Sequence, residues 1–143
     1  MYLVDANILI YAFRPDFPQH AACRKWLEDT LSNESPIAIH EITEVAFLRM
    51  VTNKKVLSSP DRFKDAAAFL DKLRQSPSVQ SLPFQPAARK RFIELAASID
   101  ATGNDVPDCH LAAIALDAGC ILVSADSGFA RFKDLRLLNP ATV

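Results

Sequence analysis

Short apolar runs alternate along this chain with longer segments in which apolar residues recur every three or four positions. The short runs predict strands at residues 1–4, 37–39, 79–84, 120–123 and 135–138. The periodic segments predict helices at residues 20–31, 41–52, 61–75, 86–99 and 108–118. A further apolar stretch at residues 8–13 predicts a turn or the start of a helix near Asn7.

The order of these elements indicates the fold class. Strands that alternate with helices form βαβ units, in which neighbouring strands run parallel and helices cover both faces of the sheet. The apolar run at residues 120–123 is typical of a central parallel strand, because both faces of such a strand are buried. The sequence contains no internal repeat and no flexible linker, so we expect one α/β domain over residues 1–143.

Three helix boundaries carry local signals. Ser58 or Ser59 can cap the helix at residues 61–75, and Pro60 suits its first turn. Pro107 is expected at the first position of the last helix, and Gly119 is expected to end that helix.

Composition narrows the class of protein. Half of the 143 residues are hydrophobic and 23% are charged, as in a globular domain and unlike a disordered chain. No apolar run approaches the ~20 residues of a membrane span, and the N-terminus lacks the features of a secretory signal. Three cysteines at irregular spacing support neither a disulfide framework nor a structural zinc site. We therefore expect a cytoplasmic protein with no membrane attachment.

The charge balance excludes one mode of nucleic-acid binding. With 16 basic and 17 acidic residues, the net charge is −1. Any affinity for a polyanion must therefore come from local clusters of cations and not from the charge of the whole molecule.

Carboxylates follow the predicted strands. Asp5 follows the first strand, and Asp126 lies just beyond the fourth strand. Asp108 lies at the beginning of the helix that precedes the fourth strand. Glu41 and Glu44 begin the helix after the second strand. Functional groups in parallel sheets gather beyond the carboxyl ends of the strands, so we expect Asp5, Glu44 and Asp126 at that edge. Asp108 joins them if its helix begins there.

Such a cluster of negative charges needs a counterion. Like charges raise one another's pKa and destabilise the fold, and no Lys or Arg adjoins Asp5, Asp108 or Asp126 in the sequence. Oxygen ligands suit Mg²⁺ or Mn²⁺, and such a site activates water for phosphodiester hydrolysis. Simpler roles stay open for the acids other than Asp5. Asp108 can interact with the helix dipole, Asp126 can form a turn, and Glu41 and Glu44 can be surface residues. Asp5, flanked by apolar residues, is expected to be buried and to need a partner, which Asn7 can supply.

Three segments resemble the motifs of one known family. Residues 4–12 (VDANILIYA), 104–115 (NDVPDCHLAAIA) and 123–129 (VSADSGF) are similar to the first, third and fourth motifs of PIN-domain ribonucleases. Within that family, residues 47–53 (FLRMVTN) are similar to a segment of the VapC toxins of type II toxin–antitoxin modules. The resemblance covers nearly the whole chain.

The second motif departs from the family pattern. Many members carry an acid immediately before a Leu-Arg-like pair, but Ala46 and Phe47 stand at that place here. Glu44 lies one helical turn earlier and is the preferred candidate. Glu41 is three residues away on a similar face of the helix, so the choice between the two stays open.

The resemblance implies a three-layer α/β/α sandwich with a mostly parallel central sheet, which binds Mg²⁺ and cuts structured RNA such as tRNA or rRNA. It implies a homodimer as well. It further implies a partner, a small VapB-like antitoxin that covers the acidic site, often with a basic residue.

On this hypothesis the acidic residues have different roles in the reaction. Asp5 and Asp108 bind the metal directly, and Glu44 and Asp126 complete a second metal site or position the attacking water. We expect Asn7 and Ser124 to orient these carboxylates by hydrogen bonds without binding the metal themselves. The basic residues that we expect to steer the RNA backbone are Arg14, Arg49, Lys54 and Lys55.

Two other functions fit part of the pattern. Asp5 after a strand is superficially similar to the nucleophile of haloacid-dehalogenase-type phosphatases, which form an aspartyl phosphate, but Asn7 stands where those enzymes carry a second Asp. The altered second motif also fits a degenerate domain that only binds RNA or an antitoxin.

Cys109 and His110 are helix neighbours that point about 100° apart, so we expect them to pack and not to form a thiol–imidazole pair.

Overall fold

The computed structural model describes residues 1–142, which form five strands, six α-helices and one 3₁₀-helix. The strands are β1 (Tyr2–Val4), β2 (Ile37–Ala38), β3 (Val79–Gln80), β4 (Ile121–Val123) and β5 (Arg136–Leu138). The helices are α1 (Ala6–Phe13), α2 (His20–Ser32), α3 (Glu41–Val51), α4 (Phe63–Arg74), α5 (Pro86–Ser98), α6 (Asp105–Ala118) and the 3₁₀-helix η1 (Ser127–Arg131). In this described part of the chain, every helix is too short or too polar to span a bilayer.

The strands form one sheet in the order β3-β2-β1-β4-β5, and every neighbouring pair is parallel. Leu3 of β1 pairs with Ala38 of β2 on one side and with Leu122 of β4 on the other. The mostly parallel sheet predicted from the alternating pattern is confirmed, and between residues 1 and 142 it is wholly parallel.

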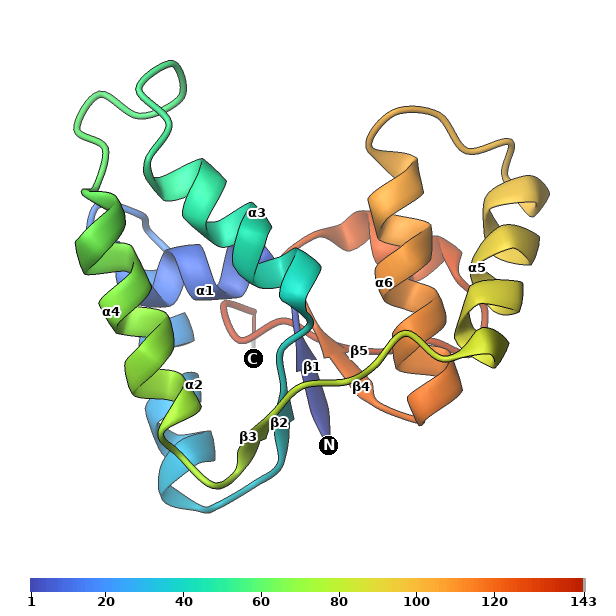
Figure 1. Ribbon diagram of the computed structural model, residues 1–143, viewed down its shortest axis with the longest axis horizontal. Helices are drawn as coiled ribbons and strands as arrows, with labels where there is room; N and C mark the ends of the chain where they lie inside the picture. Colours follow the sequence, from blue (N-terminus) through green and yellow to red (C-terminus); the bar gives the residue numbers. More distant parts are fainter. Residues whose placement is uncertain (143) are drawn as a thin grey trace.

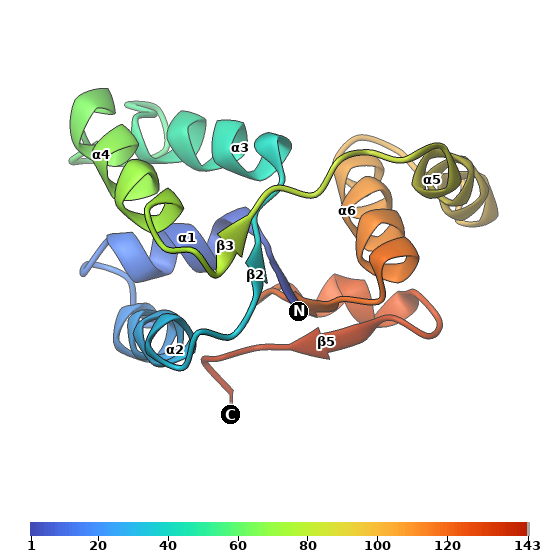
Figure 2. The same ribbon diagram turned by 60° about the horizontal axis from the view of Figure 1, so that its bottom comes forward.

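Helices cover both faces of this sheet. Figures 1 and 2 show α1 to α4 on one side of the strands and α5 and α6 on the other. Because side chains alternate along a strand, Val4 packs in a core with residues of α1 to α4, whereas Leu3 packs in a second core with residues of α5 and α6. The predicted three-layer α/β/α sandwich is therefore confirmed.

The chain changes direction across the sheet at β1. It proceeds from β1 outward through β2 to β3 and then returns through α5 and α6 to place β4 on the other side of β1. In parallel sheets such a reversal opens a crevice beyond the carboxyl ends of the two strands, and ligands bind there. Asp5 directly follows β1 and Ser124 directly follows β4, so polar side chains occupy this place.

Helix α4 begins later than predicted, and residues 58–60 lie outside it. Its N-cap is Arg62, whose side chain makes no capping hydrogen bond. The residues before it are held by tertiary contacts instead, since the N–H of Asp61 donates to the carbonyl of Val51 at 2.7 Å. The Ser-Ser-Pro signal was therefore wrong here, because a long-range contact outweighs a local cap.

Two other boundaries differ from the prediction by more than one residue. β3 ends at Gln80, and Pro83 has no N–H with which to extend the pairing through residues 79–84. Helix α6 begins at Asp105, so Pro107 is its third residue and not its first. The first N–H groups of a helix lack a partner within it, and a proline is therefore tolerated there. The 3₁₀-helix η1 was not predicted.

Candidate active site

Asp5 is held by three hydrogen bonds at the junction of β1 and α1. As the N-cap of α1, it accepts from the N–H of Ala6 at 2.7 Å through Oδ1. Its Oδ2 accepts from Asn7 Nδ2 at 2.8 Å and from Ser124 Oγ at 2.7 Å. The structure thus supplies the partner expected for Asp5, and Ser124 ties the end of β4 to the end of β1.

The same network continues to Asp126. Asn7 Nδ2 also donates to Ser124 Oγ at 3.1 Å, and Asn7 Oδ1 accepts from the N–H of Ala125 at 3.2 Å. Ser124 Oγ accepts from the N–H of Asp126 at 3.0 Å. Asp126 in turn caps η1, where its Oδ1 accepts from the N–H of Gly128 at 2.8 Å. A Cβ at Gly128 would lie 3.0 Å from that oxygen, so only glycine fits this turn without displacement.

Asp108 reaches the same edge because α6 begins there. Its Oδ2 accepts from Arg131 Nη2 at 3.1 Å, while Arg131 Nη1 donates to Asp105 at 2.9 Å. No cation adjoins Asp108 in the sequence, but the fold brings Arg131 to it from η1. Asp105 could have been found from the sequence, because two acids three residues apart share a helix face. Nothing in the sequence indicated that Arg131 belongs to the site.

The aspartates of the site repel one another. Burial raises the pKa of Asp5 most, and the charge of Asp126 raises it further against the hydrogen bonds that the carboxylate accepts. The pKa of Asp108 is raised to about 6, first by burial and then by the charge of Asp126, while Arg131 opposes the rise. The charges of these carboxylates therefore oppose one another, and a counterion would relieve that repulsion.

A small cavity of about 80 Å³ lies between α1, α3 and α6, and both Asp5 and Asp108 line it. It has room for an ion or a few water molecules. Buried Thr43 of α3 forms another wall, a residue that sequence reasoning missed. Within residues 1–142, no three His, Cys, Asp or Glu side chains lie together as a group that could hold a metal ion. The acidic donors are carboxylate oxygens under mutual repulsion, and this chemistry fits a hard divalent cation.

Glu44 does not reach this cavity. Its carboxylate accepts from Arg74 Nε at 2.7 Å, on the side of α3 that faces α4. Thr43 and Ala46 line the cavity instead, because they lie on the helix face towards α6. Glu41 is exposed and lines a neighbouring groove. The structure therefore brings neither candidate for the second acid to Asp5 and Asp108.

Arg14, predicted to steer RNA, is buried in ion pairs. Its Nε and Nη2 donate to Asp16 at 3.1 and 2.9 Å, and its Nη1 donates to Asp61. Only 6% of the residue is exposed. The guanidinium thus ties the end of α1 to the segment before α4 and is not free to meet a phosphate.

Replacing Arg14 with Met is expected to lower the free energy of unfolding by about 2 kcal/mol, because Asp61 would lose its charged partner at a partly buried position. Denaturant unfolding measures this change. Lys55→Met is the matched control: Lys55 is exposed, so stability should change by less than about 0.5 kcal/mol. An Arg14→Met protein with unchanged stability and weaker RNA binding would contradict the structural role.

The other three predicted RNA contacts are exposed. Arg49 lies on α3, and Lys54 and Lys55 follow its end. No ion pair holds any of them within the described residues. Arg49 lines a groove beside the acidic cavity, so its charge is available near the site. Contact with RNA stays a prediction for these residues.

The chain matches known proteins along nearly its full length. The model of the PIN domain family matches residues 2–135. Ribonuclease VapC43 of Mycobacterium tuberculosis is 39% identical over 142 residues, which cover 98% of this chain and 95% of that protein. Ribonuclease VapC25 of the same species is 34% identical over 142 residues, which cover 98% and 99%.

Solved structures share the fold. The VapBC2 structure from Rickettsia felis, bound to a DNA fragment from the promoter, superposes with a TM-score of 0.72 at 22% identity and covers 96% of this chain and 97% of that chain. The FitAcB structure from Neisseria gonorrhoeae superposes with a TM-score of 0.69 at 22% identity and covers 100% of both chains. At these identities the likeness concerns the fold alone.

Proposed function

This chain belongs to the PIN-domain family and is a relative of its VapC ribonucleases, and from that membership we propose that it is the toxin of a VapBC-type module, which hydrolyses phosphodiester bonds in structured RNA. We favour tRNA or rRNA as the substrate class and the cytoplasm as the place of action. The observation that carries the proposal is that Asp5 and Asp108 line one cavity while the charge of Asp126 raises the pKa of both.

In this proposal Asp5, Asp108 and Asp126 hold Mg²⁺, or alternatively Mn²⁺, which when bound makes water a better nucleophile and stabilises the leaving oxygen. Asn7 and Ser124 fix the Asp5 carboxylate by hydrogen bonds, so its orientation does not depend on the ligand. Glu44 is left out of the reaction, because Arg74 holds it on another face of α3.

Arg131 offsets part of the negative charge of the site. It bridges Asp105 and Asp108 from η1 and is about one-third exposed. A cation at the mouth of an acidic site also reduces the repulsion that an incoming phosphate would meet. Arg131 therefore helps the carboxylates to coexist and the RNA backbone to approach.

The proposal includes two protein partners. The first is a VapB-like antitoxin that covers the acidic site with a basic residue, in keeping with the VapBC and FitAB assemblies among the structural neighbours. The second is another copy of the chain in a homodimer, as the family resemblance implies. Light scattering on the purified chain and on the chain co-expressed with its antitoxin measures both assemblies.

Incubation of the purified protein with folded tRNA and rRNA fragments tests the function. We expect cuts at discrete positions in Mg²⁺, mapped by sequencing of the RNA ends, and a rate at least about 100-fold lower in EDTA. Binding of RNA or antitoxin without cleavage would favour the degenerate domain instead. An aspartyl phosphate trapped on Asp5 would favour the phosphatase.

A further inference from the structure

An apolar groove of about 520 Å³ adjoins the acidic cavity. It runs between α3 and α6, and its lining includes His40, Val45, Phe84 and His110. Ile42, Ala46 and Pro107 line both the groove and the acidic cavity, so the two spaces share a wall. The volume lies within the roughly 300–1,000 Å³ of pockets that bind small molecules.

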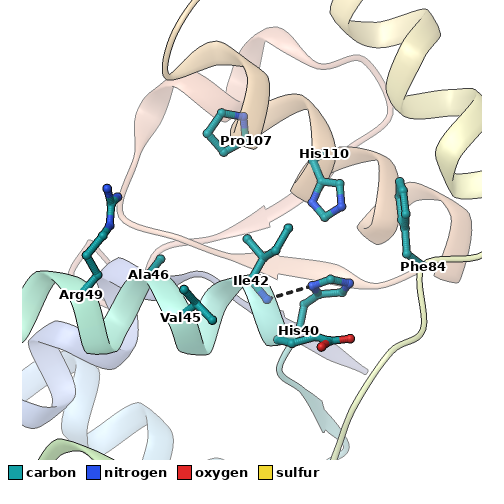
Figure 3. Close-up of a pocket in the computed structure, with 9 residues that line it drawn as sticks. His40, Ile42, Val45, Ala46, Arg49, Phe84, Pro107 and His110 are labelled. Atoms are coloured by element: carbon teal, nitrogen blue, oxygen red, sulfur yellow. Dashed lines mark hydrogen bonds between the residues drawn. The ribbon is translucent and has the colours of Figure 1, made fainter. Parts of the chain in front are cut away.

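Aromatic rings gather at one end of this groove. The ring centroids of Phe84 and His110 are 4.5 Å apart, and His40 and Phe92 lie 5.3 and 5.5 Å from His110. Figure 3 shows Phe84 and both histidines together at this end and Arg49 at the other. Phe84 is 39% exposed, so part of its ring is available to a ligand.

The two imidazoles bring polar atoms into the apolar wall. His110 is 9% exposed and forms no side-chain hydrogen bond among residues 1–142, and its ring nitrogens are open to solvent, because Gln19 Oε1 alone is both buried and unpartnered in that range. His40 is 5% exposed, and its Nδ1 accepts from the N–H of Ile42 at 3.2 Å. Neutral His40 must therefore carry its proton on Nε2, which has no partner in the same described region.

The imidazole of His40 is neutral near pH 7, because burial lowers its pKa against the opposing charge of Glu41. A neutral imidazole carries one N–H donor and one nitrogen acceptor, which are the groups that the edge of a nucleobase can pair with.

We propose that this groove receives an unpaired nucleobase of the RNA substrate, placed beside the phosphodiester that is cleaved. Phe84 and His110 stack on the base, the imidazole nitrogens bind its edge, and Arg49 lies where a flanking phosphate can meet its charge. Unpaired bases are recognised in this way, by aromatic faces combined with a few hydrogen bonds. The inference rests on the proposed ribonuclease function and adds a specificity site to it.

An RNA hairpin carrying 2-aminopurine at successive loop positions tests the groove. Binding is measured in EDTA, so the result does not depend on cleavage, and failure of the ribonuclease proposal stays distinguishable. With the parent protein we expect fluorescence quenching at one loop position, as the probe stacks on Phe84. Phe84→Ala should abolish this quenching and weaken binding about 10-fold, whereas Phe84→Trp should retain both.

Three controls separate a base contact from a general effect. Phe63→Ala removes an equally large side chain that is 63% exposed on α4, and it should leave binding and quenching unchanged. An abasic residue at the quenched position should weaken binding to the parent more than binding to Phe84→Ala, because part of the base contact is already lost there. His110→Phe keeps a ring in place, so it should retain quenching while binding to the probe weakens.

Several results would overturn the proposal. Equal quenching by the parent and by Phe84→Ala would show that the base lies elsewhere. If the losses of binding affinity from the abasic residue and from Phe84→Ala are additive, the base at that position does not contact Phe84. If Phe84→Ala binds the RNA normally but loses a VapB-like antitoxin, the groove is a protein-docking surface and not a base site.

Discussion

Replacing Asp5 with Asn is expected to reduce Mg²⁺-dependent RNA cleavage at least about 100-fold while leaving the fold intact. The change removes a negative charge that faces the cavity shared with Asp108. Asparagine fills nearly the same space and keeps one oxygen to accept from the N–H of Ala6, which now bonds Oδ1 at 2.7 Å. Burial already disfavours the charged form of Asp5, so neutralising it offsets part of the loss of the two hydrogen bonds that Oδ2 accepts from Asn7 and Ser124.

The control for this variant is Asp117→Asn, which removes an exposed carboxylate near the end of α6. It should cleave RNA at the rate of the parent. Thermal unfolding of all three proteins checks the fold, and titration with Mn²⁺ followed by electron paramagnetic resonance checks binding of the ion directly. Cleavage by folded Asp5→Asn at the parent's rate would remove Asp5 from the reaction.

The fold could be predicted because its determinants are local and periodic. Apolar residues such as Leu3 and Leu122 occur in short runs that only buried strands explain, and helical segments separate the runs. Boundaries were less predictable where a distant residue decides them. Helix α4 begins at Phe63 because Asp61, just before it, is held by Val51 and Arg14, and no local pattern encodes those contacts.

The candidate site follows the same rule. Asp5, Asn7 and Ser124 could be placed together, because each lies just beyond the end of a parallel strand, and the sheet itself brings such ends together. Glu44 could not be placed, because a shift of one residue along a helix turns a side chain by about 100°, and Arg74 holds it away from the cavity.

Arg131 shows the opposite error. Sequence distance suggested that the acidic cluster has no cation, since none adjoins Asp5, Asp108 or Asp126. The 3₁₀-helix that carries Arg131 turns it back towards the beginning of α6. Charge compensation in this fold is therefore a property of the tertiary structure, and its effect on stability can be measured.

Replacing Asp108 with Asn is expected to abolish cleavage and yet to stabilise the metal-free protein above pH 6. The pKa of Asp108 is about 6 in the folded chain, above its ordinary 3.8, because burial and the charges of Asp126, Asp5 and Asp105 outweigh Arg131. The folded state therefore binds this proton more tightly than the unfolded state. The resulting stability is fully present below about pH 4 and is lost as the pH rises towards 6.

The amide that Asp108→Asn introduces does not ionise, so the variant keeps the stability that the parent loses. Because the carboxylate is 27% exposed, we expect a gain of only about 1 kcal/mol at pH 7.5 in EDTA, or about 3 °C in Tm, and none at pH 4. Thermal unfolding across this pH range measures the difference. Mg²⁺ should raise the Tm of the parent and not that of the variant.

Arg131→Gln is the matched variant, since it deletes the same ion pair from the other side. It should lower the Tm at pH 7.5, because it leaves the repulsion among Asp108, Asp126 and Asp5 without its opposing charge and also frees Asp105. Changes in Tm of opposite sign for Asp108→Asn and Arg131→Gln are expected only if the repulsion among the acids exceeds the stabilisation from the ion pair of Asp108 and Arg131. If both variants lower the Tm equally, the pair is an ordinary stabilising ion pair, and the case for a cation-binding site at these carboxylates loses its electrostatic basis.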